Sequence, residues 1–228
     1  VTTDHQDNVI TWSRVRALVK YDKNGNLVWK RDFEWLGCHF ALGVDSQDNI
    51  IVSSSWRTAK CDKDGDVIWW KNYTFHCGES IGLVVDSKDN MIVAGWIHPT
   101  YNYYIAKIDK DGNDLWTKHP GWGILRDVAV DSEDNIVVTG WCVGRWDVIK
   151  YDHDGNELWR KQKQWRTDQD MSVEIDSQDS IVIADRNGHV LKYDKNGNEI
   201  WSRHEHGWCD VAIDSEDNII LAGFEGSN

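Results

Sequence analysis

Proline, phenylalanine and methionine are scarce in this sequence, with two, four and two copies in 228 residues. No window comes near the 18 consecutive apolar residues of a membrane-spanning helix, so we expect no membrane insertion. The N-terminal stretch VTTDHQDNVI lacks the basic start and apolar core of a signal peptide. We therefore expect a cytosolic chain or one whose leader has been removed.

Positive charge and paired cysteines are also lacking. The 25 basic residues are outnumbered by 38 acidic ones, which gives a formal charge of −13. Because this charge repels a phosphate backbone, we expect no nucleic-acid partner. The five cysteines are odd in number and contain no CxxC pair, so they predict neither a complete disulfide framework nor a zinc knuckle.

Tryptophan, by contrast, is abundant, with 15 copies, and part of it belongs to a repeat. The pattern DxxGxxxW begins at Asp22, Asp62, Asp109, Asp152 and Asp194, at spacings of 40, 47, 43 and 42 residues. Between these copies lies a second pattern of the type DSxDN. It begins at Asp45, Asp86, Asp131, Asp176 and Asp214, with a degenerate copy at Asp4. A fixed period of this length is typical of a repeat protein.

The segments between the two patterns are runs of 5 to 7 residues rich in Val, Ile, Tyr and Trp, too short for amphipathic helices. Four such runs per period match the four antiparallel strands of a propeller blade. We therefore predict an all-β, five-bladed β-propeller that forms one domain over residues 1–228. The predicted units begin near Asp4, Asp45, Asp86, Asp131 and Asp176.

The two ends of the chain offer the same strand twice. Residues 4–12 and the closing segment 209–224 both carry the DSxDN half of a unit. Propellers usually complete one blade from both termini, so we expect the ring to close by pairing of the N- and C-terminal segments. One of the duplicate strands is then spare.

The stretch DHDGNELW, starting at Asp152, resembles a calcium-binding loop at first sight. An EF-hand loop needs glycine at its sixth position and glutamate at its twelfth, whereas glycine is fourth here and only one copy has a twelfth-position acid, Glu205. Asn or Asp before Gly between two β runs is a strong hairpin signal. We therefore predict turns, each followed by a tryptophan that covers the neighbouring blade: Trp29, Trp69, Trp116, Trp159 and Trp201.

The unit VAVDSEDNIVVTGWCVGRWDVIKYDHDGNELWRK, residues 128–161, resembles the SBBP propeller repeat of bacteria and archaea, and all five units share the likeness. This resemblance implies a propeller fold and an extracellular or cell-surface location. A five-bladed ring is also similar in architecture to the tachylectin-2 type of lectin. The chain departs from the SBBP pattern by its smaller number of units and by having aspartate where that family often has glycine: Asp48, Asp89, Asp134, Asp179 and Asp217.

In such blades the two repeated turns lie at one end, and the connections that vary from unit to unit lie at the other, where recognition is expected. The variable end is rich in Trp and Arg, which suit sugar faces or a protein partner. A packing role between blades stays open for the tryptophans that end the second strands. The candidate ligand-binding residues are Trp35, Trp56, Arg57, Trp96, Trp122, Trp141, Arg145, Trp165, Arg166, Arg186 and Trp208.

Two further groups of residues lie near the predicted inner strands. One group has side chains that commonly bind zinc: Cys38, His39, His76, Cys77, His204, His206 and Cys209. These residues stand at different positions relative to the repeated turns, however. We therefore predict no metal and no cofactor. Asp127 and Asp210 share a phase, and we expect them to line a channel and to contact water and backbone amides there.

Enzyme signatures are missing as well: there is no GxSxG, HExxH, GxxxxGK or helix-opening GxGxxG pattern. The sequence thus predicts a non-catalytic, monomeric binding propeller that holds a glycan through its Trp- and Arg-rich loops. One alternative is a protein-binding scaffold. The other is a metal-dependent lyase or hydrolase with a site at the mouth of the central channel.

Overall fold

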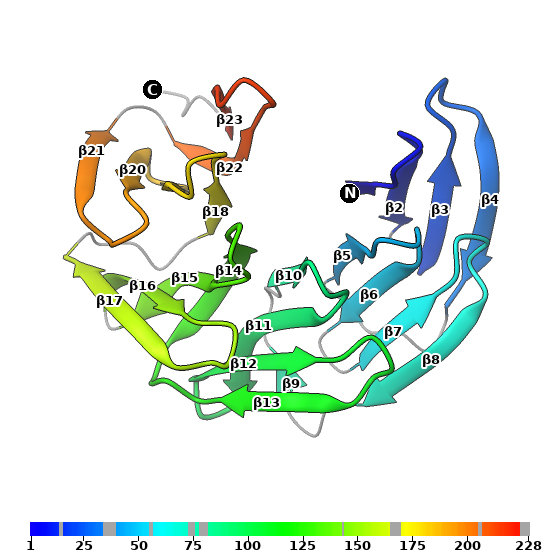
Figure 1. The fold of residues 1–228 in the computed structure, drawn as a ribbon, viewed down its shortest axis with the longest axis horizontal. Helices are drawn as coiled ribbons and strands as arrows, with labels where there is room; N and C mark the ends of the chain where they lie inside the picture. The colour runs from blue at the N-terminus through cyan, green and yellow to red at the C-terminus, as the bar shows by residue number, and fades with distance from the viewer. Residues whose placement is uncertain are drawn as a thin grey trace. The chain divides into compact units, whose positions relative to one another are not determined.

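The computed structural model describes residues 1–13, 16–33, 40–54, 57–72, 76–77, 82–142, 144–164, 170–204 and 207–223. These residues form 23 β-strands joined by turns, and every strand pair is antiparallel (Figure 1). In this part of the chain no helix is long and apolar enough to cross a membrane. The all-β prediction is confirmed.

The strands form sheets in chain order, and the chain divides into two compact units. The first unit, Val1–Thr100 with Tyr104–Thr117, holds three sheets. The first sheet has β1 (Thr2–Thr3), β2 (Val9–Ser13), β3 (Ala17–Tyr21) and β4 (Leu27–Asp32). The second has β5 (Phe40–Val44), β6 (Ile50–Ser54), β7 (Arg57–Cys61) and β8 (Val67–Asn72). The third has β10 (Gly82–Val85), β11 (Met91–His98), β12 (Asn102–Ile108) and β13 (Asp114–Lys118), and the short β9 (His76–Cys77) pairs with the end of β11.

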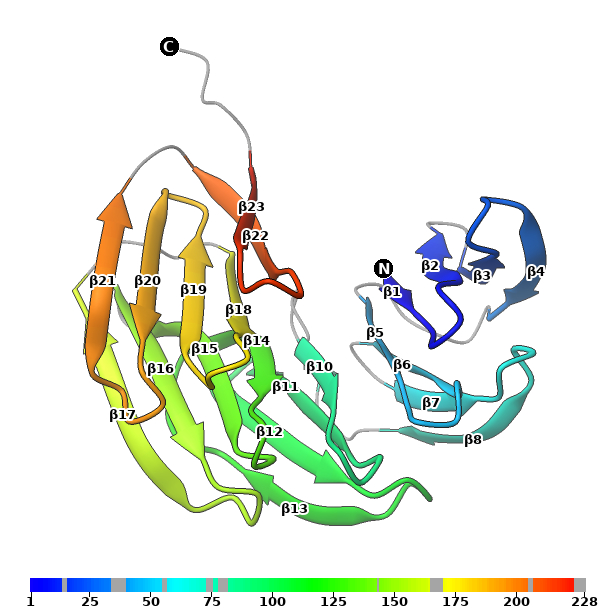
Figure 2. The same ribbon diagram turned by 45° about the horizontal axis from the view of Figure 1, so that its top comes forward.

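The second unit, Tyr101–Tyr103 with Lys118–Asn228, continues the pattern. Its first sheet has β14 (Ile124–Val130), β15 (Ile136–Cys142), β16 (Arg145–Tyr151) and β17 (Glu157–Lys163). The next has β18 (Met171–Ile175), β19 (Ile181–Asp185), β20 (His189–Tyr193) and β21 (Glu199–His204), which alternate in direction (Figure 2). Strands β22 (Trp208–Ile213) and β23 (Ile219–Gly223) form a two-stranded sheet.

The strands near each terminus pair within their own unit. Strand β23 pairs with β22, while β3 takes β2 as its inner neighbour and β4 as its outer one. A three-residue connection joins β2 to β3, so this local pairing loses little loop entropy compared with pairing to a distant segment. The number of blades and the closure of a ring therefore stay predictions.

The repeated aspartates close the turns. In DHDGN, Asp152 Oδ1 accepts the backbone amides of Asp154 and Asn156 at 3.0 and 2.8 Å, and Oδ2 accepts the side-chain amide of Asn156 at 2.9 Å. Gly155 has φ of 83°, a conformation that glycine adopts without strain. Both carboxylate oxygens thus accept hydrogen bonds from the turn itself. The prediction of hairpin turns is confirmed.

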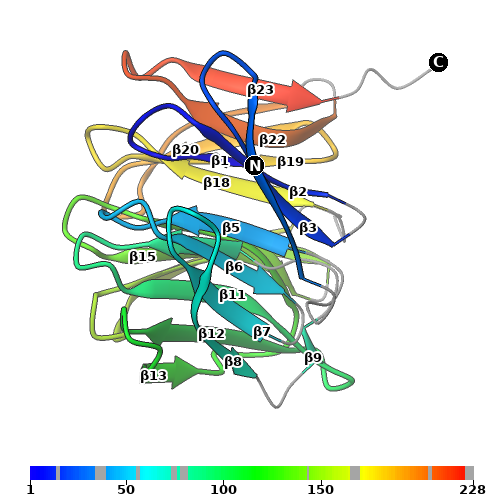
Figure 3. The same ribbon diagram turned by 90° about the vertical axis from the view of Figure 1, so that its right-hand side faces the viewer.

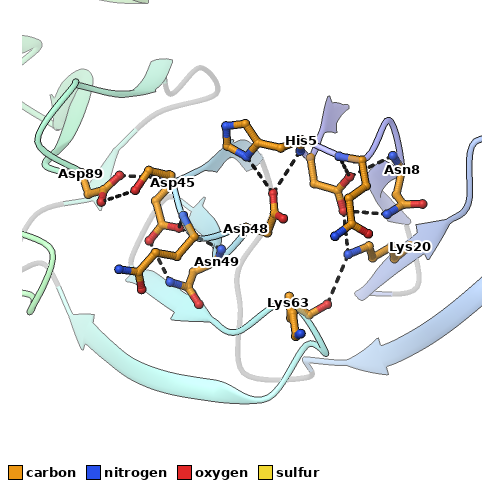
Figure 4. Close-up of polar contacts among 12 residues, drawn as sticks. His5, Asn8, Lys20, Asp45, Asp48, Asn49, Lys63 and Asp89 are labelled. Carbon is orange, nitrogen blue, oxygen red and sulfur yellow. Dashed lines mark hydrogen bonds and ion pairs between the residues drawn. The ribbon is translucent and has the colours of Figure 1, made fainter.

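The DSxDN turns have the same geometry and in addition link neighbouring sheets (Figure 4). Their fourth residue is an aspartate with φ of 60° to 63°, and in four of these turns its carboxylate binds the second turn residue of the preceding sheet. Asp48 accepts the backbone amide and Nδ1 of His5 at 3.0 and 2.8 Å. Asp89 accepts the amide and hydroxyl of Ser46 at 2.8 and 2.7 Å. In the second unit Asp179 binds Ser132 in the same way, and Asp217 binds Ser177.

A lysine on the third strand of each full sheet pairs with the first aspartate of that sheet's DSxDN turn, and four of these five lysines are buried. Lys20 Nζ lies 2.7 Å from Asp4 Oδ2 and also donates to the backbone oxygen of Lys63 in the next sheet (Figure 4). The same ion pair, at 2.7 or 2.8 Å, recurs as Lys60–Asp45, Lys107–Asp86, Lys150–Asp131 and Lys192–Asp176.

Three of the tryptophans that follow the glycine turns, Trp29, Trp69 and Trp159, pack on the next sheet, as predicted. Trp29 Nε1 donates to the backbone oxygen of Lys63, and its ring lies against Gly65, where an added Cβ would stand 3.1 Å away. Trp69 binds Lys110 and packs on Gly112 in the same way, and Trp159 binds Lys195 and packs on Gly197. These contacts cover the apolar layers between sheets.

Candidate ligand-binding surface

Within each sheet the repeated turns lie at one end of the strands, and the varied connections lie at the other (Figure 3). The described candidate residues lie at or beside that other end. Arg57 begins β7, Arg145 begins β16, and Arg186 follows β19. Trp96 and Trp141 lie near the ends of β11 and β15, Trp122 precedes β14, and Trp208 begins β22. Trp35, Trp56, Trp165 and Arg166 lie outside the described residues.

The second unit brings two of the predicted tryptophans together. The ring of Trp122 lies 6.3 Å from that of Trp141 and 6.2 Å from that of Tyr101, with interplanar angles of 48° and 55°. Trp122 is 45% exposed and Tyr101 is 40% exposed, whereas Trp141 is half-buried. We call Tyr101, Trp122 and Trp141 the aromatic cluster. Tyr101 was missed by the sequence reasoning, although the long YNYY-bearing connection of this unit is a visible signal.

The loop that carries Trp122 is fixed by its backbone. The amide of Gly123 donates to the carbonyl of Tyr101 at 2.6 Å, and the amide of Tyr103 donates to the carbonyl of Gly121 at 2.8 Å. At Gly123, φ is 145° and an added Cβ would stand 2.2 Å from the Trp141 carbonyl oxygen. Only glycine fits there, and the close approach holds Trp122 beside Trp141.

A buried polar layer lies on strands β12, β15, β16 and β17 of the same region. Arg160 donates to the Pro120 carbonyl at 2.9 Å, and its Nε lies 3.8 Å from Oδ1 of Asp147. Burial raises the pKa of Asp147 despite the opposing charge of Arg160, and burial together with Asp147 raises the pKa of Tyr103. Tyr103 interacts with Asp147, and Tyr151 with Arg160, but the contacts fall outside ideal hydrogen-bond geometry. Five buried polar atoms among the described residues make no hydrogen bond of ideal geometry: Tyr103 Oη, Trp141 Nε1, Asp147 Oδ2, Tyr151 Oη and Arg160 Nε.

Two other predicted residues, Trp96 and Arg57, differ in how far a ligand could reach them. Trp96 is 7% exposed and lies beside His98, with ring centroids 5.8 Å apart, so it presents little ring surface to a ligand. Arg57 Nε donates to Asn72 at 2.6 Å, and its guanidinium lies 5.4 Å from the ring centre of Trp70, which is 54% exposed. Trp70 is not among the predicted residues, and it belongs to the first unit rather than to the aromatic cluster. Its signal is the pair WW in β8, because alternation along a strand turns the second tryptophan to the opposite face from the packed Trp69.

The inner-strand aspartates behave as predicted in contacting backbone amides. Asp127 accepts the amides of Val128 and Val173 at 2.9 Å, and Asp210 accepts that of Val211 at 3.0 Å. A serine joins them, since Ser172 Oγ lies 3.2 Å from Asp127 Oδ2 and 2.8 Å from Asp210 Oδ1. Burial, with a smaller contribution from the charge of Asp210, raises the pKa of Asp127 to about 6.

One prediction about histidines is wrong. His204 was placed near the inner strands, but it ends β21, the outer strand of its sheet, opposite His189 of β20. Counting the hairpin register outward from the turn at Asp194 would have found this pair. The side chains of the other suggested metal ligands, Cys38, His39, His76, Cys77, His206 and Cys209, lie outside the described residues. Within the described part of the chain no group of three or more His, Cys, Asp or Glu residues is placed to hold a metal ion.

Solved structures with similar folds define the class of protein. Streptogramin B lyase superposes with a TM-score of 0.75 at 10% identity, over 99% of this chain and 82% of that one. The WD40 β-propeller domain of Doa1 gives 0.72 at 14% identity, over 97% and 73%. BamB from Moraxella catarrhalis gives 0.60 at 13% identity, over 96% and 77%. The fold is that of a β-propeller.

The sequence assigns the family. The PQQ_2 family model, described as outer membrane protein assembly factor BamB, matches residues 102–224, more than half of the chain. The chain therefore belongs to this family. No curated protein matches it in sequence. The more specific likenesses to the SBBP repeat and to tachylectin-2 stay predictions.

Proposed function

We propose that this chain is a non-catalytic binding propeller and that the aromatic cluster is its carbohydrate-binding surface. The observation that carries the proposal is the pair of exposed, tilted rings, Tyr101 and Trp122, on two connections joined by backbone hydrogen bonds. Aromatic faces of this kind pack against the apolar faces of sugar rings. A surface that is already ordered loses little entropy when a ligand binds.

The polar layer on the neighbouring strands supports the same function. Sugars present many hydroxyl groups, which need donors and acceptors in place of water. Arg160 is the partly exposed member of this layer and supplies a guanidinium, whereas Asp147 and Tyr103 are buried behind it. Binding sites often combine a mainly apolar wall with a few polar groups of this kind.

A glycan array probed with the whole chain tests this function, with tryptophan fluorescence to measure affinity. We expect Trp122→Ala and Tyr101→Ala each to weaken binding of the best glycan by roughly 10- to 100-fold, since losing one stacked ring removes on the order of 1–3 kcal/mol. Trp70→Ala is the matched control, because Trp70 is exposed to a similar degree but lies in the other unit. Equal binding by wild type and Trp122→Ala would show that the aromatic cluster is not the site.

A protein-binding scaffold is the second candidate, and the family description favours it, because an assembly factor acts on other proteins. The same exposed rings would then serve as anchors in a protein interface. A photo-crosslinking residue at position 122, with one at position 70 for comparison, separates the two candidates. A silent glycan array together with one defined crosslinked protein, found only from position 122, would favour the scaffold.

Two other expectations stay predictions. The lyase or hydrolase alternative receives no test from the likeness to streptogramin B lyase, because at 10% identity that likeness shows the fold alone. The extracellular or cell-surface location rests on the SBBP resemblance.

A further inference from the structure

Two histidines, His189 and His204, lie opposite each other on neighbouring strands, and both side chains can bind metal ions. The two residues are direct partners in the antiparallel ladder of β20 and β21. Their ring centroids lie 4.5 Å apart at an interplanar angle of 49°. Directly opposed positions place two Cβ atoms about 4.5–5.5 Å apart, so both imidazoles can reach one small ion.

A buried carboxylate orients one of the two rings. Asp185 Oδ2 lies 3.1 Å from Nδ1 of His189, and Asp185 Oδ1 accepts the backbone amide of His189 at 2.8 Å. Trp146 donates to Asp185 Oδ2 at 3.1 Å and meets the His189 ring edge-on at 6.0 Å. A carboxylate on one nitrogen of a ligating histidine fixes the ring and increases the basicity of the other nitrogen, Nε2.

We infer that His189 and His204 form a binding site for a divalent transition-metal ion such as Ni²⁺, Cu²⁺ or Zn²⁺, with Asp185 as the orienting group behind His189. Two imidazole nitrogens favour these ions, whereas Mg²⁺ and Ca²⁺ require oxygen ligands. The His189 side chain is partly exposed and that of His204 is exposed, so an ion can reach them from solvent. The site does not depend on the proposed carbohydrate binding.

Calorimetric titration of the whole chain with Ni²⁺ tests the inference. We expect saturable binding of one ion by the wild type. His189→Ala and His204→Ala should each lower the affinity by at least about 10-fold, and Asp185→Asn by about 10- to 100-fold, as for other orienting groups. His153→Ala is the matched control, since His153 is an exposed histidine in the turn after β16, and it should bind as the wild type does.

Two further measurements keep the result unambiguous. Ni²⁺ should raise the thermal midpoint of the wild type but not of His204→Ala, because a ligand stabilises only the fold that binds it. If His204→Ala does not fold by circular dichroism, His204→Gln replaces it. Equal Ni²⁺ affinity in wild type and His204→Ala, or equally strong binding of Ca²⁺, would overturn the inference, because the ion would then be held by the acidic surface.

Discussion

The aspartates at positive φ are the residues that most clearly depart from the SBBP pattern, and the structure supplies the reason. Glycine would adopt the same backbone conformation with less strain. Asp48 and Asp89, however, each add two hydrogen bonds to the turn of the preceding sheet. The side chain therefore links neighbouring blades within the unit, which glycine cannot do.

At the glycine turns, contact with a packed tryptophan should decide the cost of a side chain. Gly25 and Gly65 have nearly the same φ, 83° and 84°, but an added Cβ meets nothing within 4 Å at Gly25, whereas at Gly65 it meets Arg31 at 2.8 Å and Trp29 at 3.1 Å. We expect Gly25→Ala to cost roughly 1–2 kcal/mol of backbone strain. Gly65→Ala should cost about 1–3 kcal/mol more through overpacking.

Urea unfolding of both variants measures this difference, and Gly25→Ala serves as the control for the backbone alone. Equal midpoints for the two variants would mean that Trp29 adjusts without loss.

At the level of elements, the first strands of consecutive sheets in the second unit are joined by Asp127 on β14, Ser172 on β18 and Asp210 on β22. A hydroxyl has one proton to donate, yet Ser172 Oγ lies within hydrogen-bonding distance of both carboxylates. With both aspartates ionised, only one contact is a hydrogen bond. With a proton on one of them, both contacts are satisfied.

This arrangement predicts a loss of stability as pH rises. Burial raises the pKa of Asp127 to about 6, so its protonated form is favoured in the folded chain. The pKa of this carboxyl in the unfolded chain is near 4. Its contribution to the stability of the fold is therefore complete below pH 4 and is lost between about pH 4 and pH 6. Desolvation by nearby atoms, together with the charges of Asp127 and Asp210, raises the pKa of Glu174 to about 7. Glu174 nevertheless contributes less to this pH dependence, because its side chain is exposed and solvent screens its charge.

We expect Asp127→Asn, which mimics the protonated acid, to be more stable than wild type at pH 7.5 by about 1–3 kcal/mol and to lose this advantage at pH 4.5. Urea midpoints at the two pH values give the comparison. Asp64→Asn, at an exposed turn position, controls for the change in net charge. The same advantage at both pH values would show that Asp127 is ionised throughout.

For the whole molecule, acid stability should depend on the Asp–Lys pair that recurs in all five full sheets. Burial raises the pKa of Asp4, but hydrogen bonds from Lys20, Asn8 and Gln6 outweigh it and lower the pKa to about 2. The pKa values of Asp45, Asp86, Asp131 and Asp176 are lowered by equivalent contacts. Stability from these groups is complete above pH 4 and is lost as the pH falls towards 2.

At neutral pH the lowered pKa of Asp4 contributes about 2 kcal/mol to the free energy of unfolding. We expect steep acid unfolding between about pH 4 and pH 2, followed by circular dichroism. Lys107→Met should destabilise the chain at pH 7 by about 3–5 kcal/mol, because it leaves Asp86 buried without its cation. A flat stability profile down to pH 2 would contradict the assigned role of these pairs.

Much of the blade architecture could be predicted from the sequence because its causes are local. A turn that begins with aspartate and contains Asn or Gly closes on its own backbone, as at Asp152 and Gly155, and the strands alternate outward from it. The same locality fixes which face of a strand Trp69 occupies. The register of β20 and β21 is local too, although His204 was assigned to an inner strand.

The sequence by itself determined the all-β class, the repeated turns and the tryptophans that pack on glycine, because each depends on residues within one hairpin or one period. The tertiary structure alone decided which distant side chains meet: Tyr101 with Trp122, and Asp127 with Asp210 through Ser172. Those contacts join different strands through varied connections, whose paths depend on packing between sheets rather than on any repeated pattern.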